Sequence, residues 1–265
     1  MSISRQVRVI NWKKGSSECR DDEVATEVPV ALTYNKRSHV VMMVTPTALE
    51  DFAIGFSLTE GIIRQPSDIL EISVIERENG LEAAMTVNED CFERLAGQRR
   101  NLVGRTGCGL CGAESLDQAM RGPSVVGSHL SVTANALQTA ILSLNAHQPL
   151  QVVTGAVHGA AWCKTDGEIL ALREDVGRHN ALDKLIGFLF RTGFDASDGF
   201  ALVSSRASYE MVYKSASAGI ELLVSVSAPT ALAIDFAHRS GMTLVGFARP
   251  ERHNVYTFEN RIIDT

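Results

Sequence analysis

Alternating and periodic apolar positions define two structured regions on either side of a polar, glycine-rich stretch. In the first region, the apolar runs VPVALTY (28–34) and HVVMMV (39–44) flank the polar NKRS, which predicts a β-hairpin. Thr47 and Glu50 have the spacing of a capping box, and the apolar residues after them share one helical face. With two more strand-like runs, EISVIE and EAAMTV, residues 1–98 are predicted to form an α+β part.

Residues 132–265 show strand-like runs that alternate with helical ones. FALVSS precedes a predicted helix near 209–219, ELLVSVS precedes one that starts around Pro229, and MTLVGF reads as a further strand. This alternation is typical of an α/β layer in which helices pack on a sheet. The fold class predicted from the pattern is therefore α/β, with an α+β N-terminal part.

Residues 99–131, between these regions, are rich in glycine and lack a sustained apolar period. A segment of this composition buries little apolar surface, so it cannot offset the entropy of ordering a chain. Loops of this length are often functional. We therefore predict a mobile loop that carries function.

Composition narrows the class of protein. The chain has 265 residues, of which 45% are hydrophobic, and a formal net charge of −6. The acidic balance argues against a general nucleic-acid binder. Five cysteines with scattered spacing do not form a disulfide framework. The start of the sequence has no apolar signal region and no run of 18 apolar residues occurs, so we expect a cytoplasmic protein outside the membrane.

The stretch GRTGCGLCG (104–112) carries the candidate chemistry, because it places Cys108 and Cys111 in a C-x-x-C motif. It also matches the dinucleotide fingerprint G-x-G-x-x-G, but no clear strand precedes it and no acidic residue follows near position 132. A zinc site would need further ligands, of which His158 is one candidate. A deaminase motif, however, has a glutamate two residues after the histidine, where this chain has Ala160.

Three other interpretations of this stretch remain open. A thioredoxin-like dithiol expects the motif at a helix N-terminus, whereas glycines surround these cysteines. The stretch can also be a plain glycine-rich turn. The third interpretation is a mobile arm: glycine gives freedom of movement, and nearby arginines such as Arg105 favour the reactive thiolate. A thiolate on such an arm suits a group carrier.

Four motifs in order resemble the FdhD family of formate dehydrogenase accessory sulfurtransferases. They are GRTGCGLCG, EDVGRHNALDK (174–184), SSRASYEMVYKSA (204–216) and TLVGFARPERHNVYT (243–257). The resemblance implies sulfur transfer from a cysteine desulfurase to the Mo-bis(molybdopterin guanine dinucleotide) cofactor, which activates formate dehydrogenase. It also implies a homodimer and a cytidine-deaminase-like, layered α/β/α fold with a mixed sheet.

The resemblance also implies roles for the two cysteines of the motif. Cys108 occupies the position that carries a persulfide in the family, and a thiolate is the nucleophile for taking sulfur from another persulfide. Cys111 then assists, by resolving or relaying the persulfide. The cofactor is a bound substrate, and no tightly bound metal is predicted.

Candidate cofactor-binding residues lie in the second half of the chain. Ser205, Arg206 and Ser208 fall where a strand ends and a helix begins, a place that favours phosphate, although either serine can instead be a helix N-cap. Asp175 can accept hydrogen bonds from guanine, or can cap a helix and pair with an arginine. His158 is surrounded by small residues that leave room for a ligand.

The last candidate segment is Ala248, Arg249, Pro250, Glu251, Arg252 and His253. Family members tend to have a basic-Pro-Gly-basic pattern here as part of the cofactor site, whereas this chain has Glu251 at the glycine position. A charged surface turn is the alternative interpretation.

Two other functions stay open on the sequence alone. A zinc-dependent, deaminase-like hydrolase would need bound zinc and a carboxylate near His158. A non-enzymatic chaperone of the molybdenum cofactor would need the basic pocket but neither cysteine.

Overall fold

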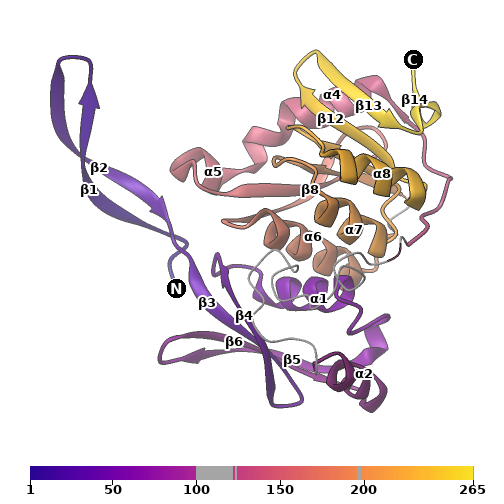
Figure 1. Cartoon of the computed structure of the whole chain (residues 1–265). Coiled ribbons are helices and arrows are strands. Elements are labelled where there is room, and N and C mark those ends of the chain that lie inside the picture. The colour runs from indigo at the N-terminus through magenta and orange to yellow at the C-terminus, as the bar shows by residue number, and fades with distance from the viewer. Residues whose placement is uncertain (100–121, 123, 196–197, 265) are drawn as a thin grey trace.

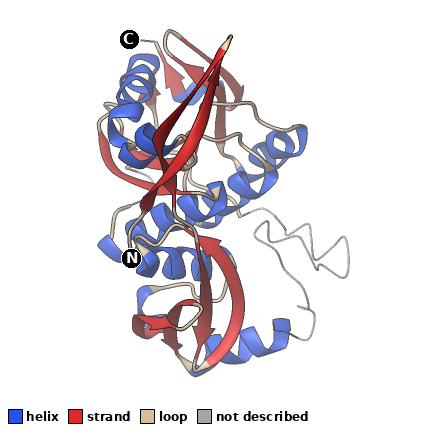
Figure 2. Ribbon diagram, turned by 90° about the vertical axis from the view of Figure 1, so that its left-hand side faces the viewer, coloured by secondary structure: helices blue, strands red, loops and turns tan. Residues whose placement is uncertain are grey.

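The computed structural model describes residues 1–99, 122, 124–195 and 198–264. Two sheets occupy opposite halves of the molecule, and an N-terminal ribbon extends from it (Figures 1 and 2). Cys108 and Cys111, with most of the predicted loop, lie outside the described residues.

The smaller sheet has four strands in the order β4-β3-β6-β5. Its strands are β3 (Val28–Tyr34), β4 (Arg37–Val44), β5 (Ile69–Arg77) and β6 (Gly80–Val87), with helix α2 (Glu89–Arg99) after them. β3 and β4 pair antiparallel, which confirms the predicted hairpin. Apolar side chains on one face of the sheet pack against helix α1 (Leu49–Thr59).

Helix α1 begins differently from the prediction. Its N-cap is Ala48, which adopts a left-handed conformation with φ of 48°, and no side chain caps the helix. The capping box predicted at Thr47 and Glu50 is therefore wrong. The Thr45 and Thr47 segment instead turns beside strand β9 (Ile169–Asp175) of the larger sheet, where the Thr45 backbone N–H donates to Asp175.

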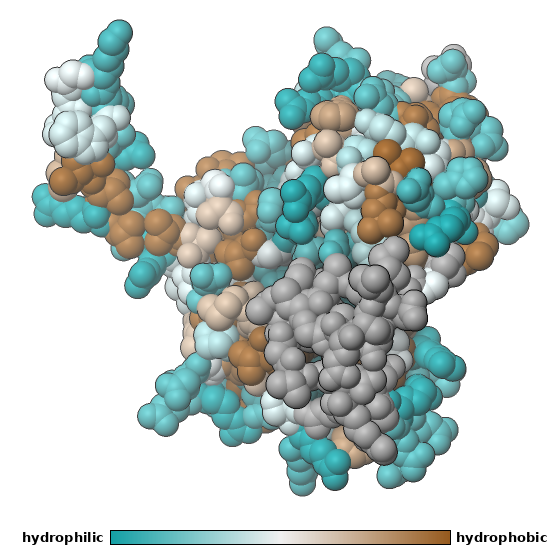
Figure 3. Space-filling view, in the orientation of Figure 1, coloured by the Kyte–Doolittle hydropathy of each residue, from teal (hydrophilic) through white to brown (hydrophobic). Residues whose placement is uncertain are grey.

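The N-terminal ribbon is formed by β1 (Ser4–Lys13) and β2 (Ser16–Ala25), which pair antiparallel over their whole length. It extends away from the rest of the molecule and shows hydrophobic patches on its surface (Figure 3). Ile10 and Trp12 are among its exposed side chains.

The larger sheet has six strands in the order β13-β12-β11-β10-β8-β9. They are β8 (His158–Lys164), β9 (Ile169–Asp175), β10 (Gly199–Val203), β11 (Leu222–Ser225), β12 (Thr243–Arg249) and β13 (Arg252–Thr257). The central strands β10, β11 and β12 are parallel, while β8 and β13 run antiparallel to their neighbours. The sheet is therefore mixed, as expected.

Helices cover both faces of this sheet and give an α/β/α arrangement. One face packs against α6 (Arg178–Thr192), α7 (Tyr209–Ser217) and α8 (Ala231–Ser240) around a core that includes Trp162 and Phe236. The other packs against α4 (Ala134–Ser143), with Leu137 and Phe200 in its core. The remaining short elements are the helix α5 (Pro149–Thr154), the 3₁₀ turns Pro66–Asp68, Leu144–His147 and Glu259–Arg261, and the paired strands β7 (Val132–Thr133) and β14 (Ile262–Ile263).

Helices α1 and α6 join the two halves. They cross so closely at Gly55 and Gly187 that a Cβ atom on Gly187 would lie 1.8 Å from the Asp51 carbonyl oxygen. Only glycine permits this approach, so the crossing fixes the small sheet against the large one. None of the helices in the described part of the chain combines the length and apolar character needed to cross a bilayer.

Candidate functional site

One edge of the six-stranded sheet gathers the predicted segments. β10, β11 and β12 end there, and the antiparallel strands β8 and β13 begin there, so that His158 pairs with Asp175 and Arg249 with Arg252. The loop that follows β10 begins at Ser204 on the same edge. In open α/β sheets, ligands bind in the crevice outside the carboxyl ends of the parallel strands. The topology thus places four segments, distant in sequence, where such a crevice forms.

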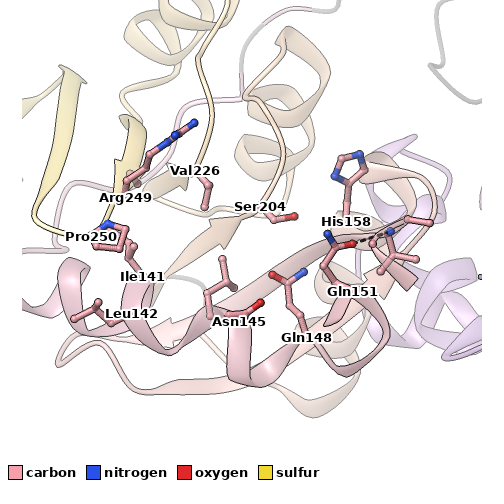
Figure 4. A pocket seen from close by; sticks show the side chains of 15 residues that line it. Ile141, Leu142, Asn145, Gln148, Gln151, His158, Ser204, Val226, Arg249 and Pro250 are labelled. Atoms are coloured by element: carbon pink, nitrogen blue, oxygen red, sulfur yellow. Dashed lines mark hydrogen bonds between the residues drawn. The ribbon is translucent and has the colours of Figure 1, made fainter. Parts of the chain in front are cut away.

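A pocket with a volume of about 750 Å³ opens at this edge (Figure 4). Of the predicted residues, it is lined by His158, Ala248, Arg249 and Pro250, and Ser204 of the SSRAS segment joins them. Ser204 holds the wall together, because its hydroxyl accepts a hydrogen bond from the Gly159 N–H at 2.9 Å and its own N–H donates to the Gly159 carbonyl at 3.0 Å.

The position of Arg249 follows from an irregularity in β12. The register between β12 and β13 shifts between Gly246 and Arg249, and Phe247 adopts φ of 51°. Bulges of this kind re-aim the side chains that follow them. The buried Ala248 anchors the strand in the core, while the exposed Arg249 reaches the pocket.

The turn after Arg249 is held by α4. Glu251 has φ of 67°, and its backbone N–H donates to the Gln138 side-chain oxygen at 2.8 Å. The Gln138 side-chain nitrogen lies 3.1 Å from Nδ1 of His253, whose pKa is lowered by burial. Because Gln138 of α4 contacts both Glu251 and His253, α4 fixes the turn at the pocket, which Pro250 lines.

Three arginines near this edge have no carboxylate partner among the residues that the structure describes. Arg206, Arg249 and Arg252 are exposed, and none of them forms an ion pair with a residue that the structure describes. Arg249 and Arg252 lie directly opposite each other on neighbouring strands, an arrangement of like charges that is unfavourable by itself. In a chain of net charge −6, arginines on one edge that the described carboxylates leave unpaired form a site suited to an anion.

The two predicted serines of SSRAS, Ser205 and Ser208, are buried and do not line this pocket. The Ser205 hydroxyl donates to the Arg206 carbonyl at 3.1 Å. Ser208 occupies the N-cap position of α7, but its hydroxyl does not cap the helix. That hydroxyl is buried and has no hydrogen-bond partner among the described residues. The structure thus brings Ser204 to the pocket, a residue of the predicted SSRAS segment that was not singled out as its neighbours were.

His158 lies half-buried at the start of β8 and lines the pocket. Burial lowers its pKa, the nearby Arg178 lowers it further, and Asp175 partly opposes both effects. The imidazole is therefore neutral at pH 7, and it can offer a ligand one donor and one acceptor.

Asp175 has a different position from the one expected of a guanine-binding residue. Its carboxylate is fully buried and accepts hydrogen bonds from the N–H of Thr45 at 3.0 Å, from the N–H of Gly177 at 2.8 Å and from the side chain of Asn180 at 2.9 Å. Lys184 pairs with it at 2.7 Å. These partners occupy the carboxylate, so the structure favours a structural role, with Lys184 as the ion-pair partner instead of an arginine.

The described cysteines do not offer a reactive thiol in this pocket. Cys163 is buried in the larger sheet, and burial raises the pKa of its thiol far above the ordinary value. Burial also raises the pKa of Cys91, despite the adjacent Arg94. Cys19 is exposed on the ribbon. The described residues contain no group of three or more His, Cys, Asp or Glu side chains placed to hold a metal ion.

Gln148 is a pocket residue that the motifs did not reveal. It lies immediately before α5, in a stretch without a recognisable pattern, and its side chain lines the pocket (Figure 4). Only its three-dimensional placement beside β8 distinguishes it from the other glutamines of the chain.

Comparisons with known proteins agree with the motifs. The model of the FdhD/NarQ family matches residues 25–263. A sulfur carrier protein FdhD of Cupriavidus necator is 51% identical over 254 residues, covering 96% of this chain and 88% of that protein. The protein of the same name from Xanthomonas euvesicatoria is 50% identical over 264 residues, covering 98% and 92%.

A solved structure is similar over the whole chain. It is the crystal structure of a candidate formate dehydrogenase accessory protein from Desulfotalea psychrophila, with a TM-score of 0.80 and 26% sequence identity. The match covers 99% of this chain and 100% of that one, so it includes the N-terminal ribbon as well as both sheets.

Proposed function

The chain belongs to the FdhD/NarQ family, and from this we propose that it carries sulfur for the maturation of a formate dehydrogenase. The names of the relatives and of the similar structure support this role. The structural observation that supports it is the pocket of about 750 Å³ at the sheet edge, which Arg249 lines and near which Arg252 lies on the neighbouring strand.

The first step of the proposed reaction takes place on Cys108. Its thiolate attacks the outer sulfur of a persulfide on a cysteine desulfurase. The sulfur–sulfur bond of the donor breaks, a new one forms on Cys108, and the donor cysteine leaves as a thiolate. No net oxidation or reduction occurs in this exchange. Cys111, three residues further on, is proposed to assist.

The second step needs the acceptor held nearby. We propose that the pocket binds the Mo-bis(molybdopterin guanine dinucleotide) cofactor as a substrate. Arg249, with Arg206 and Arg252 on the same edge, supplies the positive charge that a diphosphate requires. The neutral imidazole of His158 and the hydroxyl of Ser204 can form hydrogen bonds with the ligand, and neither adds a negative charge to the pocket.

Three features implied by the resemblance stay predictions: a homodimer, a cytoplasmic location, and the cytidine-deaminase-like arrangement of the second half.

The proposal is tested by intact-mass spectrometry after incubation with a cysteine desulfurase and cysteine. We expect the wild type to gain one sulfur atom that a reductant removes, and Cys108→Ala to gain none. Cys19→Ala is the matched control, because Cys19 is an exposed thiol on the ribbon, and it should gain sulfur normally. If only Cys111→Ala fails to gain sulfur, the persulfide is carried by Cys111, and its assignment to Cys108 is wrong.

Activation of formate dehydrogenase separates this function from that of a cofactor chaperone. A sulfur carrier loses activation in Cys108→Ala, whereas a chaperone that only binds the cofactor retains it. Full activation by Cys108→Ala would therefore refute the persulfide role and leave the basic pocket as the functional part.

A further inference from the structure

The side chain of Gln148 does not cap the helix that it precedes. The residue occupies the N-cap position of α5, but its side chain makes no capping hydrogen bond. Glu174 of β9 performs that task, because its carboxylate accepts from the N–H groups of Leu150 at 3.0 Å and Gln151 at 2.8 Å. The Gln148 amide is therefore free to line the pocket.

The side-chain amide nitrogen of Gln148 is buried and has no partner in the described part of the chain. The residue is only 4% exposed, and Nε2 has no hydrogen bond to any residue that the structure describes. Leaving a buried donor unsatisfied is costly, so a group of this kind calls for a partner that arrives from outside. Gly159 provides the space it occupies, since a Cβ atom there would lie 2.4 Å from Nε2.

The pocket differs in polarity from end to end. Arg249 and Pro250 lie at one end, whereas Gln148, Gln151 and His158 lie at the other (Figure 4). Arg249 is the one permanently charged residue among those described as lining the pocket. The side-chain oxygen of Gln151 already accepts a hydrogen bond from the Val157 N–H at 3.0 Å. A diphosphate thus belongs at the Arg249 end, and an uncharged ring at the Gln148 end.

We propose that Gln148 binds the edge of a heterocycle in which a ring carbonyl adjoins a ring N–H. A primary amide matches that edge, because its N–H donates to the ring carbonyl and its oxygen accepts from the ring N–H. A phosphate offers acceptors only and would leave the amide oxygen unmatched. Guanine and pterin both carry this edge, and both occur in the proposed cofactor. The inference rests on the proposed function for the identity of the ligand.

Calorimetric binding to the purified full-length protein tests this role without sulfur transfer. The probes are GDP, free pterin and inorganic pyrophosphate. We expect Gln148→Ala to weaken binding of GDP or of pterin roughly fivefold to tenfold, the loss of one or two neutral hydrogen bonds, and to leave pyrophosphate binding within twofold. A loss for GDP identifies guanine as the ring at this end, and a loss confined to pterin identifies the pterin.

Two further variants test whether any loss of binding comes from the position of the Gln148 amide. Gly159→Ala keeps the amide but forces it from its place, so it should weaken the same probe as Gln148→Ala. Asn135→Ala removes an exposed amide of α4 that does not line the pocket, and it should leave every probe within twofold. Thermal melting checks that each variant is folded.

The outcomes separate this role from the proposed function. Unchanged binding of both rings by Gln148→Ala, or an equal loss for pyrophosphate, would overturn the role of Gln148 while leaving the anion site in place. Absence of binding of all three probes to the wild type would overturn the pocket assignment and the Gln148 role together, whereas failure to gain sulfur would refute only the carrier step.

Discussion

Charged side chains are arranged in opposite ways at the joint between the two halves and at the edge of the larger sheet. At the joint, Lys214 pairs with Asp183 at 2.8 Å, and both side chains are largely buried. Asp51 on α1 pairs with arginines of β9 and α6, also at 2.8 Å. At the sheet edge, Arg249 and Arg252 are exposed and face each other without a carboxylate partner among the described residues.

This difference separates stability from binding. A buried charge is tolerated only when a partner and hydrogen bonds compensate for its lost hydration. The folded state at the joint therefore depends on both members of each buried pair. Exposed arginines that repel each other contribute little to folding and stay available for a ligand. Substitutions at the joint should therefore reduce the free energy of unfolding, and substitutions at the edge should reduce affinity.

The largest effect is expected from Asp183→Ala. The change leaves the ammonium group of Lys214 buried with only the more distant carboxylate of Glu60, at 4.0 Å, and also removes a hydrogen-bond partner of Thr59. Breaking one side of a buried pair costs about 3–5 kcal/mol. Urea unfolding measures the change in the free energy of unfolding.

Glu168→Ala is the matched control for that experiment. Glu168 pairs with Lys164 on an exposed strand end, where water screens the interaction, so its loss should lower the free energy of unfolding far less than Asp183→Ala does. Equal losses in Asp183→Ala and Glu168→Ala would show that burial does not set the value of these pairs.

An intermediate effect is expected from Arg249→Ala, and it should concern affinity rather than stability. A charge-assisted hydrogen bond contributes about 1.5–3 kcal/mol, so pyrophosphate should bind roughly tenfold to a hundredfold more weakly. The free energy of unfolding should change by no more than about 0.5 kcal/mol, because the side chain is exposed. Calorimetry and urea unfolding on the same variant check both parts, and a fall in stability without a fall in affinity would contradict the division.

The sequence predicted those elements whose apolar period decides their structure. The β3–β4 hairpin and the alternation of strands and helices from β10 to β12 follow directly from such periods. The start of α1 did not, because contacts with β9 from 130 residues away place Thr45 and leave Ala48 in a left-handed N-cap. Local capping rules cannot anticipate a tertiary contact of that kind.

The candidate site shows the same limit. Arg249 and His158 stand out in the sequence, and the pocket contains both. Asp175 stands out equally but is occupied by Lys184 and by backbone N–H groups. Gln148 belongs to no motif. Its side-chain nitrogen lacks a partner among the described residues because Glu174, distant in sequence, caps α5 in its place, and local sequence does not reveal such a contact. Residue type suggests which groups can bind, but the fold decides which of them stay free.

The smallest effect is expected from Glu251→Gly, at the turn between the two facing arginines. Glu251 has φ of 67°, a region that glycine enters without the steric cost of a Cβ atom. Relief of this strain, less the greater entropy of glycine in the unfolded chain, should stabilise the protein by about 0.5–1 kcal/mol in urea unfolding. Glu251→Ala is the control, because it removes the same carboxylate but keeps the Cβ atom. A gain shared by both variants would attribute the effect to the acidic charge beside Arg249 and Arg252, whereas a gain confined to glycine would show that the edge holds backbone strain along with unpaired charge.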